Sequence, residues 1–243
     1  MSVRLIAITQ PVIEDCANSG DLIAYCARVS NPSNQANTET APRLLSYLAR
    51  NEHWSPFEMA SMTLEIVTTR DIARQILRHR SFSFQEFSQR YAVATDPPVY
   101  RAARMQDAKN RQNSIATDDA SVQADWRHDQ QKVANFSAIA YGLALRAGIA
   151  KEVARAVLPE GMTSSTLYMA GTIRSWLHYV QLRTQDGTQL EHRRIAEACG
   201  DILFTRFPAL RQVMTQAALD AEELEGLREE VKQLRFRLAG LDK

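Results

Sequence analysis

The chain has 243 residues, of which 45% are hydrophobic and 23% charged, a composition typical of a globular protein that buries a core. Its 29 basic and 28 acidic residues give a formal net charge of +1, which excludes a global field that would attract nucleic acid or an anionic membrane. Any anion-binding site must therefore be a local cluster of basic residues.

Cysteine usage and hydropathy argue against a disulfide-rich, zinc-binding, exported or membrane-spanning protein. Cys16, Cys26 and Cys199 form no C-x-x-C pair and show no His/Cys spacing suited to zinc, so we expect no disulfide framework and no metal site. Residues 1–9 lack the apolar run of a signal peptide, and no segment approaches ~20 consecutive apolar residues. These features predict a cytoplasmic protein that makes no contact with a membrane.

The first hundred residues predict strands followed by one polar-faced helix. Apolar residues alternate with period two at residues 3–9 and 62–66, which indicates strands, and residues 43–52 have helical spacing. Thr68-Thr69-Arg70-Asp71 resembles a capping box, so we expect a helix from there, with Arg78 and His79 on its polar side. Residues 81–99, which end in two prolines, read as an ordered loop.

The remainder is predominantly helical in pattern. Residues 107–129 are polar, and we expect part of them to be mobile. Residues 163–169 read as a strand, and the predicted helices span residues 133–147, 150–158, 173–180 and 190–207. The fold class is therefore α+β, with a central antiparallel or mixed sheet packed against helices.

The last residues carry a separate pattern. Steps of three and four residues, typical of a coiled-coil seam, connect Leu224, Leu227, Val231, Leu234, Leu238 and Leu241. The run is shorter than the three to four heptads of a firm coiled-coil prediction. We divide the chain into one domain, residues 1–210, and a helical tail, residues 211–243, which either adds contacts between copies or packs on its own domain.

Basic and hydroxyl side chains gather between residues 75 and 90. The three guanidinium groups of Arg78, Arg80 and Arg90, with the hydroxyls of Ser83 and Ser88, outline a phosphate or pyrophosphate site. Gln75 and Glu86 would add groups able to read the edge of a base. A solvated surface with ion pairs at a helix end explains the same cluster equally well from spacing alone.

The motif Arg78-His79-Arg80-x-x-Ser83-x-Gln85-x-x-Ser88-x-Arg90 resembles the signature of the flavin-dependent thymidylate synthases, R-H-R-x-x-S-x-N-x-x-S-x-R. It departs from that signature at Gln85, where the family has Asn. Further segments resemble the family as well, with Thr172 standing where Asn is more frequent: His53–Glu58, Glu152–Arg155 before Leu158-Pro159, Thr172–His178, Leu182-Arg183 and Gln189–Glu191. The resemblance spans residues 53–191.

The resemblance implies an enzyme that converts dUMP to dTMP. A methylene group would come from 5,10-methylenetetrahydrofolate, hydride from reduced FAD, and electrons from NADPH. The residues implied to bind dUMP are Gln75, Arg78, Glu86, Ser88, Gln89, Arg90, Arg155 and Arg183. Those implied to bind FAD are Ser55, Arg78, His79, Arg80, Glu86, Arg174 and His178. It also implies a homotetramer with sites shared between subunits.

The residue types in the sequence also indicate how FAD would be held and how the uracil ring would be activated. With no G-x-G-x-x-G motif, FAD must be held by side chains rather than by a Rossmann unit. None of the cysteines has a setting that activates a thiolate, so uracil must be activated electrostatically, a role we assign to Arg183. Ser88 lacks an aligned base, so we interpret it as a ligand and not as a nucleophile.

Several alternatives remain at the level of sequence. Glu152 and Arg155 could form a surface ion pair, His178 could be a buried histidine, and Trp176 fits core packing better than ligand stacking. The loop of residues 78–91 could belong to a nucleic-acid-binding module, although the near-zero charge opposes this. A catalytically silent nucleotide-binding protein is the second alternative.

Arg174 and Arg183 are about 180° apart on a helix, so we expect them to face different partners.

Overall fold

The computed structural model describes the backbone of residues 1–241 and all of their side chains except those of residues 217–222, 225, 229, 233 and 235–241. The chain divides into two compact units. The first contains Met1–Ile8 and Ser61–Ile202, and the second contains Thr9–Ala60 and the chain from Leu203. The boundary predicted at residue 210 stays a prediction.

The first unit is built on a four-stranded antiparallel sheet in the order β1-β2-β6-β3. Its strands are β1 (Ser2–Ile8), β2 (Ser61–Thr69), β3 (Ser83–Glu86) and β6 (Ser164–Thr172). Met62, Leu64 and Ile66 are 1% exposed or less, and they alternate with partly exposed residues, as period two requires. The predicted α+β class with a central sheet is confirmed.

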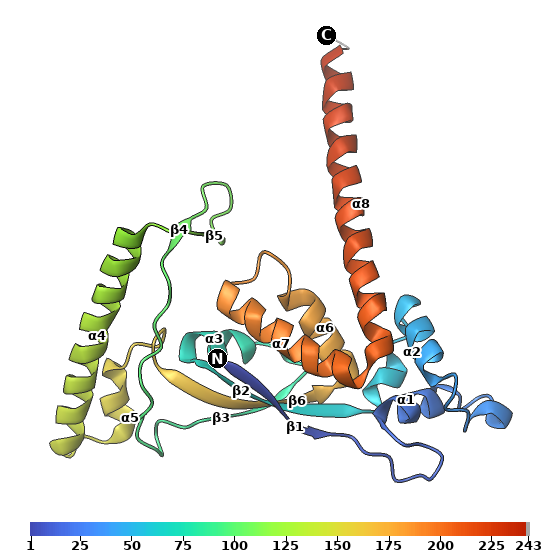
Figure 1. The fold of residues 1–243 in the computed structure, drawn as a ribbon, viewed down its shortest axis with the longest axis horizontal. Coiled ribbons are helices and arrows are strands. Elements are labelled where there is room, and N and C mark those ends of the chain that lie inside the picture. The colour runs from blue at the N-terminus through green and yellow to red at the C-terminus, as the bar shows by residue number, and fades with distance from the viewer. Residues whose placement is uncertain (242–243) are drawn as a thin grey trace. The chain divides into compact units, whose positions relative to one another are not determined.

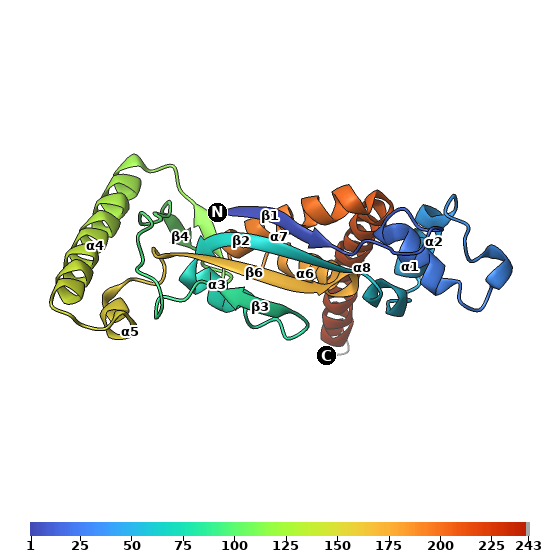
Figure 2. The same ribbon diagram turned by 90° about the horizontal axis from the view of Figure 1, so that it is seen from below.

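Helices α3 (Arg70–Ile76), α6 (Ile173–Arg183) and α7 (Leu190–Arg206) lie on one face of this sheet (Figures 1 and 2). Residues of α7 up to Ile202 belong to this unit. Trp176 on α6 is fully buried, and its indole N–H donates to the carbonyl of Met62 over 2.9 Å. Trp176 therefore packs in the core, as its sequence pattern indicated.

A helix begins at Arg70 as predicted, but three local predictions near the site are wrong. Thr69, not Thr68, is the N-cap residue of α3, and its hydroxyl donates to Asp71 over 2.6 Å instead of capping the helix. The helix ends at Ile76, so Arg78 and His79 lie in the following turn and not on its polar side. Residues 83–86 form β3 because pairing with β6 satisfies their backbone, which local polarity could not reveal.

The segment between β3 and β6 contains more secondary structure than its polar sequence indicated. Strands β4 (Arg104–Gln106) and β5 (Ser114–Ala116) form a hairpin, and α4 spans Ala120–Arg146, starting well before the predicted residue 133. The side chain of Asp119 caps α4 by accepting from the N–H groups of Ser121 and Val122. The N-terminal half of α4 is therefore helical because of its side-chain cap and tertiary contacts, although its apolar pattern is weak.

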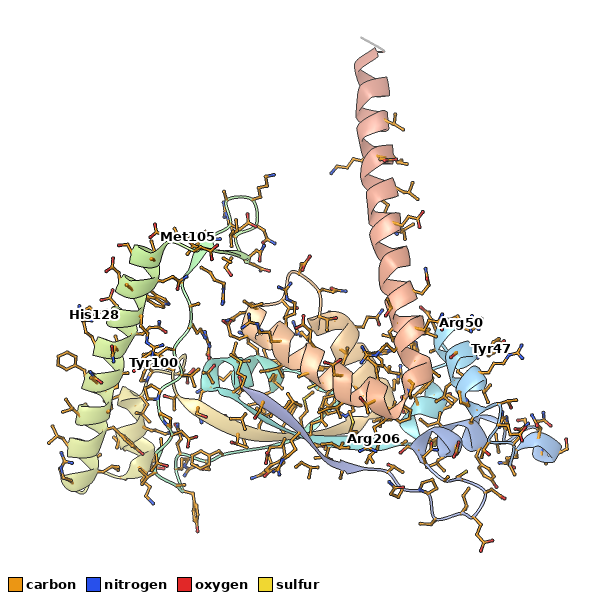
Figure 3. All side chains as sticks on the ribbon, in the orientation of Figure 1. Tyr47, Arg50, Tyr100, Met105, His128 and Arg206 are labelled. Atoms are coloured by element: carbon orange, nitrogen blue, oxygen red, sulfur yellow. The ribbon has the colours of Figure 1, made fainter. Side chains whose placement is uncertain are left out.

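Helix α4 is fastened to the chain that leads into the hairpin. The amide of Gln130 exchanges two hydrogen bonds with the backbone of Arg101, at 2.8 and 2.9 Å. The Arg127 guanidinium lies 4.1 Å from the ring centroid of Tyr100, which Figure 3 places on the segment beside α4. The short helix α5 (Lys151–Ala154) and a 3-10 turn (Arg155–Val157) also pack on α4.

The second unit is helical. It contains α1 (Ser19–Ala27), α2 (Ala41–Arg50), a 3-10 turn (Ser55–Glu58) and α8 (Pro208–Leu241). The start of α8 packs on α2, where Leu45, Leu210 and Val213 are buried and the Ser46 hydroxyl donates to the carbonyl of Ala209 over 3.0 Å. Among the described residues no helix is long and apolar enough to cross a membrane.

Candidate functional site

The signature motif begins in the turn that follows α3. The N–H groups of Arg78 and His79 donate to the carbonyls of Gln75 and Ile76, which closes the helix. Arg78 and Arg80 are exposed, whereas the His79 ring between them is half-buried. The turn therefore presents two guanidinium groups to solvent and directs one imidazole inward.

His79 meets Arg183, the last residue of α6. The guanidinium Nε donates to Nε2 of His79 over 2.9 Å, so Nε2 acts as the acceptor of a neutral ring. Burial and the Arg183 charge both lower the pKa of His79, because each disfavours the imidazolium. The structure thus joins a residue predicted for the flavin to one predicted for the uracil ring.

A cluster of aromatic rings packs against the His79 side of the His79–Arg183 pair. Ring centroids of His79 and Tyr179 lie 4.9 Å apart, and those of Phe82 and Trp176 lie 4.8 Å apart, both in edge-to-face arrangements. Phe82 approaches β6 closely at Gly171, where an added Cβ would stand 2.5 Å from the ring. Glycine is required here for close approach and not for backbone conformation.

Gln75 contacts Gln189, the residue before α7, and His192 on α7. Its side-chain N–H donates to Gln189 over 2.7 Å, while its carbonyl oxygen lies 3.3 Å from Nδ1 of His192. His192 is fully buried, and its Nε2 lies 3.1 Å from the hydroxyl of Tyr179. Burial lowers the pKa of His192 to about 4, assisted by the charge of Arg183, so the ring is neutral near pH 7.

A buried ion pair orients the same part of α7. Arg104 forms two hydrogen bonds to the carboxylate of Glu191, at 2.6 and 3.0 Å, and Gln189 donates a third at 3.0 Å. Burial alone would raise the pKa of Glu191, but these hydrogen bonds, with one from its backbone N–H, outweigh it and hold the pKa at about 2. Glu191 is thus ionised throughout the physiological range.

Sequence reasoning missed three members of this network: Tyr179, His192 and Arg104. His192 directly follows the Gln189–Glu191 segment of the family resemblance, and that adjacency was the one available signal. Arg104 lies 87 residues before Glu191, so nothing in the sequence indicated their contact. Tertiary structure alone brings them together.

Glu86 ends β3 and is restrained by two neighbours. The Ser165 hydroxyl on β6 donates to its carboxylate over 2.7 Å, and Arg70 Nη1 lies 3.5 Å away. Nη1 of Arg70 is buried without a hydrogen-bond partner among the described residues. Glu86 therefore stands at the edge of the sheet as a preorganised acceptor beside an additional donor.

The turn after β3 carries Ser88, Gln89 and Arg90 to α5. Arg90 donates to the Glu152 carboxylate over 3.2 Å, and Arg155 donates to the Glu152 carbonyl over 3.3 Å. Glu152 thus brings two predicted dUMP-binding arginines together, and its carboxylate pairs with Arg90 instead of Arg155. Ser88 is exposed, whereas Gln89 is 3% exposed and its Nε2 has no partner within the described part of the chain.

The remaining predicted residues lie elsewhere. Arg174 and His178 share α6 with Arg183, and His178 is exposed, so it is not a buried core histidine. Thr172 is the N-cap of α6, because its hydroxyl accepts from the N–H of Ser175 at 3.3 Å. Ser55 opens the 3-10 turn of the second unit.

Two hollows lie outside this cluster in the first unit. One of about 110 Å³ lies beside Phe87, between Val93–Asp96 and Thr163–Thr166. The other, of about 410 Å³, lies beside the hairpin and is lined by Arg101–Met105, Ser114, Val122 and Trp126. Neither coincides with the predicted residues around His79. Across the described residues, no three His, Cys, Asp or Glu side chains gather as metal ligands.

Two of the three cysteines, Cys16 and Cys199, lie where the thiolate is disfavoured. Cys199 is fully buried on α7, and burial raises the pKa of its thiol. Burial also raises the pKa of Cys16, with a further contribution from the charge of Asp21. Both changes disfavour the thiolate.

Comparison with known proteins places this geometry in a family. Residues 11–209 match the family described as thymidylate synthase complementing protein. A protein of Paramecium bursaria Chlorella virus 1, named "Probable flavin-dependent thymidylate synthase", is 52% identical over 88% of this chain and 99% of its own length. The flavin-dependent thymidylate synthase of Synechocystis is 51% identical over 86% of this chain and 97% of the relative.

A solved structure agrees with these matches. The UMP/dUMP methylase PolB of Streptomyces cacaoi, bound with 5-Br dUMP, is 28% identical and superposes with a TM-score of 0.73. The superposition covers 88% of this chain and 94% of that one. The sequence signature, the sheet that carries it and the extent of these matches together show that the chain belongs to the flavin-dependent thymidylate synthase family.

Proposed function

We propose that this enzyme makes dTMP from dUMP, with 5,10-methylenetetrahydrofolate as carbon donor and NADPH as reductant of bound FAD. The observation that carries the proposal is the meeting of Arg183 with His79 at the end of α6, beside the Gln75 network. Arg183 on α6, Gln75 on α3 and His192 on α7 thus lie close to His79 in the turn after α3. The family motif predicts that dUMP and FAD bind at this position.

The donor set around the turn after α3 fits FAD. Arg78 and Arg80 expose two permanently charged forks suited to a pyrophosphate, and the half-buried His79 ring offers a flat surface. Arg174 and His178 on α6, together with Ser55 and Glu86, complete the proposed flavin contacts. When bound, the flavin supplies the hydride that completes the methyl group.

The turn after β3 fits dUMP. Arg90 and Arg155, gathered by Glu152, would hold the phosphate with the hydroxyl of Ser88 and with Arg78. The buried, unpartnered amide of Gln89 is a donor in need of an acceptor, which a bound nucleotide can provide. Gln75 and Glu86, both preorganised by neighbours, would hydrogen-bond the uracil edge.

Arg183 would activate the uracil ring. Its Nε is engaged by His79, which orients the guanidinium and leaves its terminal nitrogens as donors. A charged donor near O2 and N3 would stabilise negative charge on the uracil ring and so favour the electron-rich form from which C5 attacks the methylene carbon. Because Cys16 and Cys199 disfavour the thiolate form, electrostatic activation fits this chain better than covalent attack by a thiol.

Assembly and location are part of the same proposal. We expect a homotetramer with sites shared between subunits, since the proposed ligands contact residues from well-separated segments. A cytoplasmic location agrees with three unpaired cysteines. Small molecules are the expected ligands, not nucleic acid or a membrane.

The test is spectroscopic and chemical. Purified protein should be yellow with an oxidised-flavin spectrum, and should release tritium from [5-³H]dUMP when given methylenetetrahydrofolate and NADPH. Flavin and dUMP binding without tritium release would identify a silent nucleotide-binding protein. Protein that stays colourless after FAD is added, yet binds single-stranded nucleic acid, would favour the nucleic-acid-binding alternative.

Substrate choice and the nucleophile need separate measurements. UMP should compete poorly with dUMP, because the two relatives that share about half of this sequence are both named as thymidylate synthases. The Ser88→Ala variant should bind dUMP more weakly and still turn over. Complete loss of turnover with unchanged dUMP affinity would reinstate serine as a nucleophile.

A further inference from the structure

The distal part of α8 carries an exposed apolar stripe. Leu224, Leu227, Val231 and Leu234 are 48%, 52%, 47% and 55% exposed, respectively. Earlier on the same helix, Leu210 and Val213 are buried. The stripe is therefore not used for packing within its own unit, in contrast to the start of α8.

These four residues follow a heptad register. Taking Leu224 and Val231 as a positions places Leu227 and Leu234 at d positions, and the sequence repeats the pattern at Leu238 and Leu241, whose side chains lie outside the described residues. One heptad before Leu227, the d position is Asp220, so the apolar seam begins after this polar residue. At one of the three a positions, Val231 combines with leucines at the d positions in the pattern that favours two-stranded pairing.

The seam lies beyond the part of the chain shared with its relatives. The family match ends at residue 209, just after α8 begins. The match to the viral relative uses 99% of that protein but only 88% of this chain. The inference does not depend on the reaction proposed above, because no residue of the proposed site lies in this segment.

We propose that this seam binds the same seam of a second copy of the chain, with the two helices parallel. The flanking charges select this occupant and direction. Glu223 and Glu230 occupy g positions and Arg228 an e position, and all three are exposed. In a parallel pair each g residue faces the partner's e residue five positions later, which sets Glu223 against the partner's Arg228.

The next repeat preserves the same complementarity. Glu230 would face the partner's Arg235, five positions later in the sequence. An antiparallel pair would instead set g against g and e against e, so the e-position arginines would face each other, whereas only the parallel pair sets both Glu223 and Glu230 against arginines at e positions. With fewer than three full heptads, the seam needs the effective concentration that other contacts between copies provide. The full chain is therefore the object to test.

Disulfide trapping tests both the pairing and its direction. In a parallel pair Leu224 lies opposite the partner's Leu224, so the Leu224→Cys full-length chain should form a cross-linked dimer under mild oxidation. Gly226→Cys is the matched control, because an added Cβ there meets no atom within 4 Å and points away from the seam. The unmodified chain measures background from Cys16, Cys26 and Cys199.

The outcomes separate cleanly. High dimer yield for Leu224→Cys and background yield for Gly226→Cys support the proposal. Background yield for Leu224→Cys, or equal yields for the two variants, overturns it. Because Leu224 is half exposed, the substitution should leave folding intact, which circular dichroism checks.

Charge exchange provides an independent test in the Leu224→Cys background. Chains carrying Glu223→Lys pair lysine with arginine, and chains carrying Arg228→Glu pair glutamate with glutamate, so each should cross-link several-fold less alone. When the two variants are mixed, both g-to-e contacts become attractive again and heterodimer yield should recover. Equal yields for homodimers and heterodimers would contradict the parallel arrangement.

Discussion

Arg183 donates from Nε to Nε2 of His79 over 2.9 Å, and this bond joins the C-terminal end of α6 to the turn after α3. Each residue constrains the other. The imidazole accepts and therefore stays neutral, while the guanidinium loses one degree of freedom and keeps its terminal donors. The two predicted ligand groups, one for flavin and one for uracil, are thus parts of a single polar network.

Removing the Arg183 charge should raise the pKa of His79. In the Arg183→Gln variant burial still lowers that pKa, but the electrostatic contribution is absent, so the pKa should move toward its ordinary value. Histidine ¹H–¹³C NMR titration measures the change. Arg174→Gln, nine residues away on the same helix, should leave the His79 titration as it is. An unchanged His79 titration in Arg183→Gln would show that the contact carries no electrostatic effect.

Arg183→Lys should preserve flavin content and reduce dTMP formation by about 10²-fold. Lysine retains the charge, but its point-like ammonium cannot both bind His79 and direct a planar fork at the uracil. Loss of one well-placed donor to a developing anion costs about 10²–10³ in rate. Tritium release per bound flavin is the measurement. Turnover equal to that of the unmodified protein would remove Arg183 from the chemistry.

His192 should make the fold sensitive to acid. Its pKa is about 4 in the folded state and about 6.5 when unfolded. As the pH falls, the unfolded chain takes up the proton first, so the stabilisation is complete above about pH 6.5 and is lost progressively towards pH 4. The difference corresponds to about 3 kcal/mol.

The measurement is urea unfolding from pH 7 to pH 4. His192→Gln should lose distinctly less stability over this range than the unmodified protein. His128→Gln, which changes an exposed histidine on α4 (Figure 3), should follow the unmodified protein. Parallel curves for the unmodified protein and His192→Gln would mean that His192 does not titrate as described.

Two glutamates should differ sharply in their contribution to stability. Glu191→Gln leaves Arg104 charged and half satisfied in a buried site, which should destabilise the protein by about 3–5 kcal/mol. Glu152→Gln breaks an exposed pair with Arg90 and should change stability by less than about 1 kcal/mol. Chemical denaturation at pH 7 compares them. Similar values for both would indicate that the Arg104–Glu191 pair is well solvated.

Gly171→Ala should disturb the aromatic cluster beneath His79. The new methyl group would stand 2.5 Å from the Phe82 ring, and displacement of a packed ring costs about 1–3 kcal/mol. Because Phe82 supports His79 and Trp176, we also expect weaker flavin retention. Gly187→Ala is the control, since a Cβ there meets no atom within 4 Å. A melting temperature of Gly171→Ala equal to that of the control would contradict this packing.

Several predictions from sequence were wrong for one physical reason. Residues 83–86 have no strand signal of their own, and β3 exists because β6 supplies its hydrogen-bond partners. Helix α4 begins at Ala120 because Asp119 caps it and Gln130 binds the backbone of Arg101. The β3–β6 pairing and the Gln130 contact depend on partners distant in sequence, whereas β2 and α6 were predictable because their apolar periodicity is local.

The sequence by itself determined the family, the α+β class and the residues of the signature, because the spacing of residues within short segments and local periodicity are properties of the chain alone. Tertiary structure decided how these residues act together. It placed Arg183 on His79, Glu152 between two arginines, and His192 with Glu191 behind Gln75. The Arg183–His79, Arg90–Glu152 and Gln75–His192 contacts join residues more than 60 positions apart, and only packing of the sheet and helices selects them.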